Sequence, residues 1–168
     1  MKYNHNRKLK LNKYLIAGLI ITGIVIIIGI ISAFATPYST TQMSASEKFA
    51  APSLKHIMGT DNFGRDIFSR VMQGIGTTVL ISTLTIAFSG TIGIIIGAFT
   101  GYFGGIIDEI IMRINDALNS FPSILLALVV ISVLGTGKQN VILSLGIVFI
   151  PSFVRIVRGE FIRLRDAE

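Results

Sequence analysis

Four long blocks of this chain carry no Asp, Glu, Lys or Arg, and they restrict its possible folds more than any other feature. The blocks cover residues 14–46, 71–107, 117–137 and 139–154. A helix needs about 20 apolar residues to cross the hydrocarbon core of a bilayer. The blocks therefore predict four membrane-spanning helices, over about residues 14–35, 75–99, 110–134 and 139–156. The expected fold class is an all-α, polytopic membrane protein.

The composition supports this class and excludes several others. Only 14% of the 168 residues are charged, whereas a soluble domain has about a quarter. There is no cysteine, and the two histidines, His5 and His56, have no partners at ligand spacing, so neither a metal site nor a cofactor is predicted. The net charge of +6 comes largely from basic residues before the first span. Basic residues there orient a membrane helix, so no nucleic-acid partner is predicted.

The N-terminus resembles a secretory signal, with an A-x-A pattern at residues 33–35. The uncharged run that precedes this pattern is longer than the roughly 7–15 apolar residues of a signal peptide, so a retained first helix is expected. With the N-terminus in the cytoplasm, ten of the 15 basic residues lie inside: Lys2, Arg7, Lys8, Lys10, Lys13, Arg113, Arg155, Arg158, Arg163 and Arg165. This bias agrees with the positive-inside rule. The segment between the first two spans is then extracytoplasmic.

That segment ends in a charged stretch, residues 60–70. Asp61 precedes Arg65 by four residues, and Asp66 precedes Arg70 by four, which is the favourable order for ion pairs on a helix. Apolar residues between them form one stripe, so the spacing predicts a short amphipathic helix on the outer membrane surface. Two interpretations stay open: a solvated collar that anchors a hairpin, or a docking or gating element at the outer mouth of a pore.

The second span contains glycines four residues apart. Gly93 and Gly97 are predicted to form a helix-packing seam, because small residues let membrane helices approach closely. Gly101 and Gly105 are expected in the turn into the third span. Polar side chains of the spans that could line a pathway are Ser82, Thr83, Thr85, Ser89, Asn115, Asn119 and Ser120.

The third span begins with charged residues at the inner interface. Glu109 and Arg113 are expected to pair, and Asp116, the deepest acid, should face protein or water. Pro122 should kink or open this helix. No catalytic set is found: Gly135–Lys138 lacks the other residues of a phosphate-binding loop. An enzyme is not predicted.

Several motifs together resemble a known family, the second ("C-type") permease subunit of ABC importers for dipeptides, oligopeptides and nickel or metallophores. The outer motif comprises Gly59, Thr60, Asp61, Gly64, Arg65, Asp66, Ser69 and Arg70. The second block comprises Gly101, Gly105, Asp108, Met112, Arg113 and Asp116. The pattern continues in Phe121–Pro122, Leu134, Gly135, Gly137 and Asn140. The approach to the family's ATPase-coupling loop is resembled by Arg155, Arg158, Leu164 and Arg165.

The resemblance implies a bacterial inner-membrane permease with about six membrane helices. Its implied partners are a second permease subunit, cytoplasmic ATP-binding subunits, an extracytoplasmic substrate-binding protein and the lipid bilayer. The outer motif would lie near the outer gate, and Asp108, Arg113 and Asp116 would form an inner-interface cluster. The family continues into a Glu-Ala-Ala-x-x-x-Gly coupling loop and two further helices after the position of Glu168, so the chain is expected to be a truncated form.

The expected organisation has four parts: a cytoplasmic N-terminus (1–13), a first transmembrane helix (14–36), an extracytoplasmic loop with the amphipathic helix (37–74), and the start of the permease domain (75–168). The expected function is part of the translocation pathway of an importer. The alternative is a small four-helix membrane scaffold or regulatory protein without transport activity. Peptide and nickel or metallophore cargo stay equally open.

Overall fold

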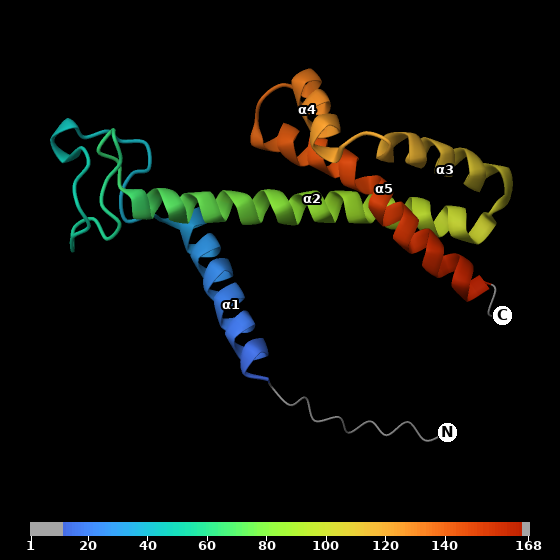
Figure 1. The fold of residues 1–168 in the computed structure, drawn as a ribbon, viewed down its shortest axis with the longest axis horizontal. Helices are drawn as coiled ribbons and strands as arrows, with labels where there is room; N and C mark the ends of the chain where they lie inside the picture. Colours follow the sequence, from blue (N-terminus) through green and yellow to red (C-terminus); the bar gives the residue numbers. More distant parts are fainter. Residues whose placement is uncertain (1–11, 166–168) are drawn as a thin grey trace. The chain divides into compact units, whose positions relative to one another are not determined.

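The computed structural model describes residues 12–165, and its regular elements in that range are helices. The chain divides into two compact units at residues 79 and 80, inside the second long helix. Figure 1 shows the elements and their order. The predicted cytoplasmic N-terminus, residues 1–13, lies outside the described residues except for its last two. The all-α fold class is confirmed.

In the first unit, helix α1 (Lys13–Phe34) is apolar on every side, and only Gly29 in it is buried. Asn12 caps its start by accepting a hydrogen bond from the Tyr14 N–H. Such a helix is expected in lipid, which agrees with the predicted first span. The first turns of α2 (Ile67–Phe103) approach α1 at two glycines, Gly29 and Gly76. The nearby Ser32 hydroxyl is satisfied by the Gly29 carbonyl, at 2.8 Å.

The segment between α1 and α2 is a loop with one short 3-10 helix, η1 (Ala45–Glu47). The prediction of a separate amphipathic helix over residues 60–70 is wrong. Residues 60–66 form a tight turn, closed by an antiparallel bridge between Thr60 and Asp66, and α2 begins only at Ile67. Gly59 and Gly64 both have φ of +72°, which a helix does not allow.

Asp61 explains why a turn forms instead of a helix. Its Oδ1 accepts hydrogen bonds from the backbone N–H groups of Phe63 (2.8 Å) and Arg65 (3.0 Å). Aspartate side chains offer the backbone this alternative to helical hydrogen bonds. Gly64 then supplies the left-handed residue that the turn requires, and an added Cβ there would overlap the Ser44 carbonyl.

Helix α2 has 37 residues, or about 55 Å at 1.5 Å per residue, so it extends beyond the hydrocarbon core of about 30 Å. The predicted second span, 75–99, lies inside it. The turn into the next helix is at Gly104 and Gly105, both with positive φ. Gly101, expected in that turn, is helical.

The second unit contains the end of α2 and three more helices: α3 (Gly105–Asn119), α4 (Ser123–Leu134) and α5 (Lys138–Arg165). The predicted third span is broken, since α3 and α4 meet at 93°. Pro122 lies at the break, as predicted, because proline lacks an N–H and disfavours a helical residue before it. Within residues 12–165, three helices are long and apolar enough to span a membrane, or four if the bent pair counts as one span.

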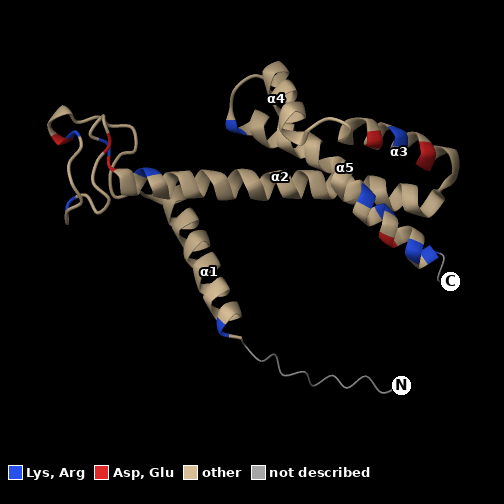
Figure 2. Cartoon of the chain, viewed as in Figure 1, with Lys and Arg blue, Asp and Glu red and all other residues tan. Residues whose placement is uncertain are grey.

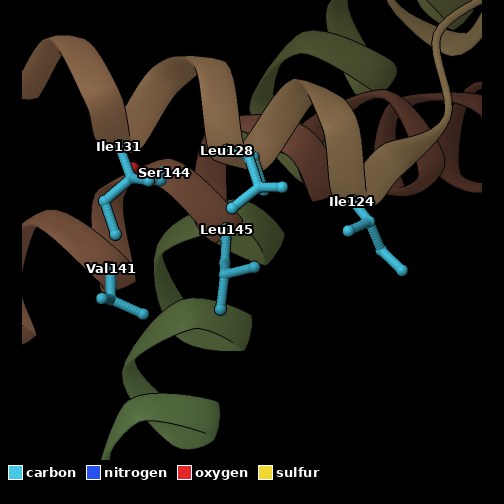
Figure 3. Close-up of a pocket in the computed structure, with 7 residues that line it drawn as sticks. Ile124, Leu128, Ile131, Val141, Ser144 and Leu145 are labelled. Atoms are coloured by element: carbon cyan, nitrogen blue, oxygen red, sulfur yellow. The ribbon is translucent and has the colours of Figure 1, made fainter.

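Helix α5 packs against both parts of the broken span. Figure 1 shows α4 turning back over the N-terminal part of α5, while α3 runs beside its C-terminal part. The predicted fourth span, 139–156, lies within α5, which continues through Pro151 to Arg165. Between α4 and α5 an apolar groove of about 250 Å³ is lined by Ile124, Leu128, Ile131, Val141 and Leu145 (Figure 3).

Candidate functional site

Two groups of polar side chains stand out, one in each unit. We call them the loop cluster (Tyr38, Glu47, His56, Asp66 and Ser69) and the ion-pair cluster (Asp108, Asp116, Arg155 and Arg158). Each is built from side chains that lie far apart in the sequence.

Asp66 is the centre of the loop cluster. It is buried, and its Oδ2 accepts hydrogen bonds from the Ser69 N–H and the Ser69 hydroxyl, both at 2.7 Å. Its Oδ1 lies 2.9 Å from His56 Nδ1. Burial raises the pKa of the Asp66 carboxyl, but the bonds from Ser69 and His56 outweigh it and hold that pKa below its usual range. Asp66 is therefore an ionised acceptor at neutral pH.

Ser69 extends the cluster to the start of the loop. Its Oγ accepts a hydrogen bond from the Tyr38 N–H at 3.0 Å, and the Tyr38 ring packs on the His56 ring with centroids 4.8 Å apart. Asp66 immediately precedes α2 and Ser69 lies in its first turn, so these contacts fasten the two ends of the loop to each other. Asp66 and Ser69 were predicted as motif residues from the sequence. Tyr38 was not, because it lies 31 residues before Ser69 and no motif in the sequence marks it.

Asp61 forms a second, more exposed charge group. Its Oδ2 accepts from Arg65 Nε at 2.8 Å and also pairs with the Arg70 guanidinium. Burial raises the pKa of Asp61, but the hydrogen bonds from Arg65 and from the backbone hold it well below its usual range. The predicted Asp61–Arg65 pair is present. The predicted Asp66–Arg70 pair is wrong, because Asp66 faces His56 and Arg70 turns to Asp61.

Glu47 completes this side of the loop. Its backbone carbonyl accepts from the buried Thr60 hydroxyl, and its carboxylate pairs with Lys55. The hydrogen bond from Lys55 lowers the pKa of Glu47. Gly59 is packed against the Ala50 carbonyl, 2.5 Å from where a Cβ would lie. Gly59 and Thr60, motif residues by resemblance, thus hold the loop backbone in place.

The ion-pair cluster joins α3 to α5. Arg158 Nε and Nη2 bind both oxygens of Asp108, and the side chains are 28% and 14% exposed. Arg155 Nη2 lies 2.8 Å from Asp116 Oδ1 in a more exposed pair. Figure 2 shows acidic residues on α3 and basic residues on the C-terminal half of α5, while α4 carries no charge. Asp108 and Asp116 of the predicted inner-interface cluster thus meet Arg158 and Arg155 of the predicted approach to the coupling loop.

Arg113 does not join the ion-pair cluster. It pairs with Glu109 one turn earlier on α3, at 3.2 Å, and both side chains are exposed. Arg165, at the end of α5, lies 3.4 Å from the Gly101 carbonyl of α2. Asn115 also links the helices: its buried amide donates to the Pro151 carbonyl at 3.0 Å. Among the polar pathway candidates, Asn115, Thr85 and Ser89 are buried.

The glycines of α2 form the contact with α5. An added Cβ at Gly97 would lie 2.7 Å from the Val154 carbonyl and 2.9 Å from Val157 Cβ. Gly93 faces Phe153 in the same way, and Gly101 continues the seam one turn later against Phe161. This close approach brings the α5 backbone onto α2 and positions Arg155 and Arg158 beside α3.

The comparisons with known proteins bear on both clusters. A family model described as "Binding-protein-dependent transport system inner membrane component" matches residues 93–168, a range that contains the ion-pair cluster. The dipeptide transport system permease protein DppC of Alkalihalophilus pseudofirmus is 38% identical over 96% of this chain and 53% of its own length. DppC of Bacillus subtilis is 33% identical over 96% of this chain and 51% of its length.

A third relative is the glutathione transport system permease protein GsiD of Pectobacterium atrosepticum. It is 41% identical over 115 residues, which are 68% of this chain and 38% of that protein. The chain thus spans about half the length of the DppC relatives that it matches.

Proposed function

This chain belongs to the family of inner-membrane permease components of binding-protein-dependent transport systems, and we propose that it forms part of the translocation pathway of an ATP-driven importer. The family consists of membrane permeases and not of enzymes. The observation that carries the proposal is the similarity to DppC over 96% of the chain, which includes both polar clusters. The multi-pass helical fold supports it.

The partners follow from the proposal. They are a second permease subunit, cytoplasmic ATP-binding subunits and an extracytoplasmic substrate-binding protein. The excess of basic residues in the predicted inner segments supports a cytoplasmic N-terminus in a bacterial plasma membrane. The loop before α2 would then face the substrate-binding protein, with Gly59, Thr60, Asp61, Gly64, Arg65, Asp66 and Arg70 near the outer gate.

The ion-pair cluster would hold α5 in the orientation that the ATP-binding subunits require. A partly buried bidentate arginine–carboxylate pair fixes the relative rotation of two helices better than a single contact does. Asp108 and Arg158 form such a pair, and Arg155 and Asp116 add a second contact two turns along α3. The end of α5 at Arg165 is then placed by contacts to both α2 and α3.

Peptides are the proposed cargo class. Relatives are named for dipeptide and for glutathione transport, and glutathione is itself a small peptide. Uptake of radiolabelled dialanine by cells that express the chain together with the partners proposed above tests this. Saturable, ATP-dependent uptake that is lost on deletion of the chain is expected. Uptake of nickel or of a metal chelate in its place would assign the cargo to the other branch of the family.

Affinity purification from detergent-solubilised membranes tests the assembly. We expect a second permease and ATP-binding subunits to co-purify with the tagged chain. Arg158→Gln should reduce their recovery, because it breaks the pair with Asp108. Arg163→Gln is the matched control, since Arg163 pairs with Glu160 on its own helix in an exposed position. Recovery of a stable helical protein with no partner would favour the alternative of a membrane scaffold.

A further inference from the structure

The loop before α2 encloses a polar cavity that the proposed function does not use. Its volume is about 210 Å³, and its lining includes Ser39, Gln42, Glu47, Lys55 and His56. This volume suits a small molecule or the end of a side chain. The cavity lies wholly within the first unit.

One buried atom of this lining has no hydrogen-bond partner. His56 Nε2 has none, although the His56 side chain is only 7% exposed. The nearest charged atom is Glu47 Oε2, at 3.6 Å, which is too long for a hydrogen bond. A buried polar atom without a partner is costly, so a group that belongs there is expected.

The second ring nitrogen of His56, Nδ1, determines what kind of group is expected at Nε2. Asp66, which faces His56 Nδ1 at 2.9 Å, is ionised and can only accept hydrogen bonds. The Nδ1 atom must therefore carry the proton, and in the neutral imidazole Nε2 is a bare acceptor. Glu47 Oε2 is also an acceptor. Two acceptors that face each other across 3.6 Å require a donor that both can share.

The charges around the cavity favour a cationic donor. Glu47 and Asp66 are both negative, and Lys55 is the single cation among the described residues that line the cavity. Lys55 is engaged with the other oxygen of Glu47, Oε1, and is largely exposed. Apart from the His56 ring, the lining thus carries one uncompensated negative charge. Two acceptors and a net negative charge match an ammonium group, which has several N–H donors and one positive charge.

We propose that this cavity is a binding site for a primary ammonium group, held between Glu47 Oε2 and His56 Nε2. The free amino terminus of a small peptide and the side-chain ammonium of a lysine or a small amine share this chemistry. The site does not depend on transport, because it is built from the loop alone. The charged and titratable groups that face His56 are Glu47, Asp66 and Tyr38, with Lys55 across the cavity.

The test uses the full chain in lipid nanodiscs at pH 8, with His5→Gln so that one histidine remains. Nitrogen-15 NMR of the ring should show the Nδ1–H form. Methylammonium should shift the Nε2 resonance saturably, and tetramethylammonium, a cation without N–H donors, should bind at least about tenfold more weakly, as expected for a charge-assisted hydrogen bond.

Variants separate the ligand from the fold. Glu47→Gln should weaken methylammonium binding about tenfold, while Lys55→Met should leave it equal or tighter, because it removes a competing cation. Glycylglycine binding where N-acetylglycylglycine does not would identify a peptide amino terminus as one source. Methylammonium binding without glycylglycine binding would point to a side-chain amine. The proposal is overturned by an Nε2–H form of His56, by equal effects of both methylated cations, or by no effect of methylammonium, which would leave water as the donor.

Discussion

At the scale of single residues, the contact between α2 and α5 depends on positions that carry no side chain. Gly97 lies where α5 backbone atoms come within contact distance of a missing Cβ. Gly159, in contrast, lies in α5 with open space where an added Cβ would point. These two glycines therefore differ in environment although both are helical, and alanine should affect them in opposite directions.

Gly97→Ala should lower the stability of the protein by about 1–3 kcal/mol, because the methyl group must displace the backbone near Val154. Gly159→Ala should be neutral or stabilising by up to about 1 kcal/mol, because alanine has the higher helix propensity. Helical circular dichroism during thermal unfolding in detergent measures both. Equal effects of the two substitutions would contradict the packing seam.

The lowered pKa of Asp66 determines how the stability of the loop should change with acid. Its pKa is lower in the folded loop than in an unfolded chain, where it is about 3.9. The stabilisation is then complete above that ordinary value and is lost as the pH falls below it through the folded-state pKa. The Ser69 amide, which donates to Asp66 Oδ2 at 2.7 Å, is the reporter.

We expect the NMR shift of the Ser69 amide proton to be constant from pH 7 to about 4 and to move toward a water-exposed value below that. Asp66→Asn should lower loop stability at pH 7 and remove this transition. A transition that persists unchanged in Asp66→Asn would assign the acid response to another group, such as Asp61.

At the scale of elements, the sequence predicted the helices better than the segments between them. The long uncharged blocks predicted α1, α2 and α5, because a helix satisfies all of its backbone hydrogen bonds internally in lipid. The charged stretch at residues 60–66 was misassigned, because the four-residue spacing of Asp61 and Arg65 fits a helix and a tight turn equally well. Gly59 and Gly64, both with positive φ, were the signal for the turn.

The sequence predicted the residues of the ion-pair cluster but not which of them pair. Asp108, Asp116, Arg155 and Arg158 were each singled out, but their pairing depends on how α3 rotates against α5. That rotation follows from the glycine seam and from the bend at Pro122, which spacing along one helix does not reveal. Arg113 had the expected local partner, Glu109, because an i,i+4 pair needs no tertiary information.

A double-mutant cycle on Asp108→Asn and Arg158→Gln should give a coupling energy of about 1–2 kcal/mol, because the pair is bidentate and mostly screened from water. The matched cycle on Glu109→Gln and Arg113→Gln should give about 0.3–0.5 kcal/mol, as expected for an exposed pair on one helix. Stability in detergent, followed by circular dichroism, provides both values. A coupling no larger than that of the exposed pair would mean that α3 and α5 are not held by this contact.

At the scale of the whole molecule, the proposed importer role requires that the loop before α2 is extracytoplasmic and that the turn between α2 and α3 is cytoplasmic. The excess of basic residues in the inner segments supports this topology. A substrate-binding protein could then reach the loop, and ATP-binding subunits could reach the end of α5. The opposite orientation would separate both clusters from the partners proposed for them.

Cysteine accessibility tests this topology most directly, because the chain has no cysteine of its own. Two variants are each treated with a membrane-impermeant maleimide. Leu54→Cys places the thiol at a fully exposed loop position, and Glu109→Cys places it at an exposed position of α3. The account predicts that Leu54→Cys is labelled in spheroplasts or protoplasts, whose cytoplasmic membrane is intact. Glu109→Cys should be labelled only after that membrane is permeabilised. Labelling of Glu109→Cys before Leu54→Cys would contradict it.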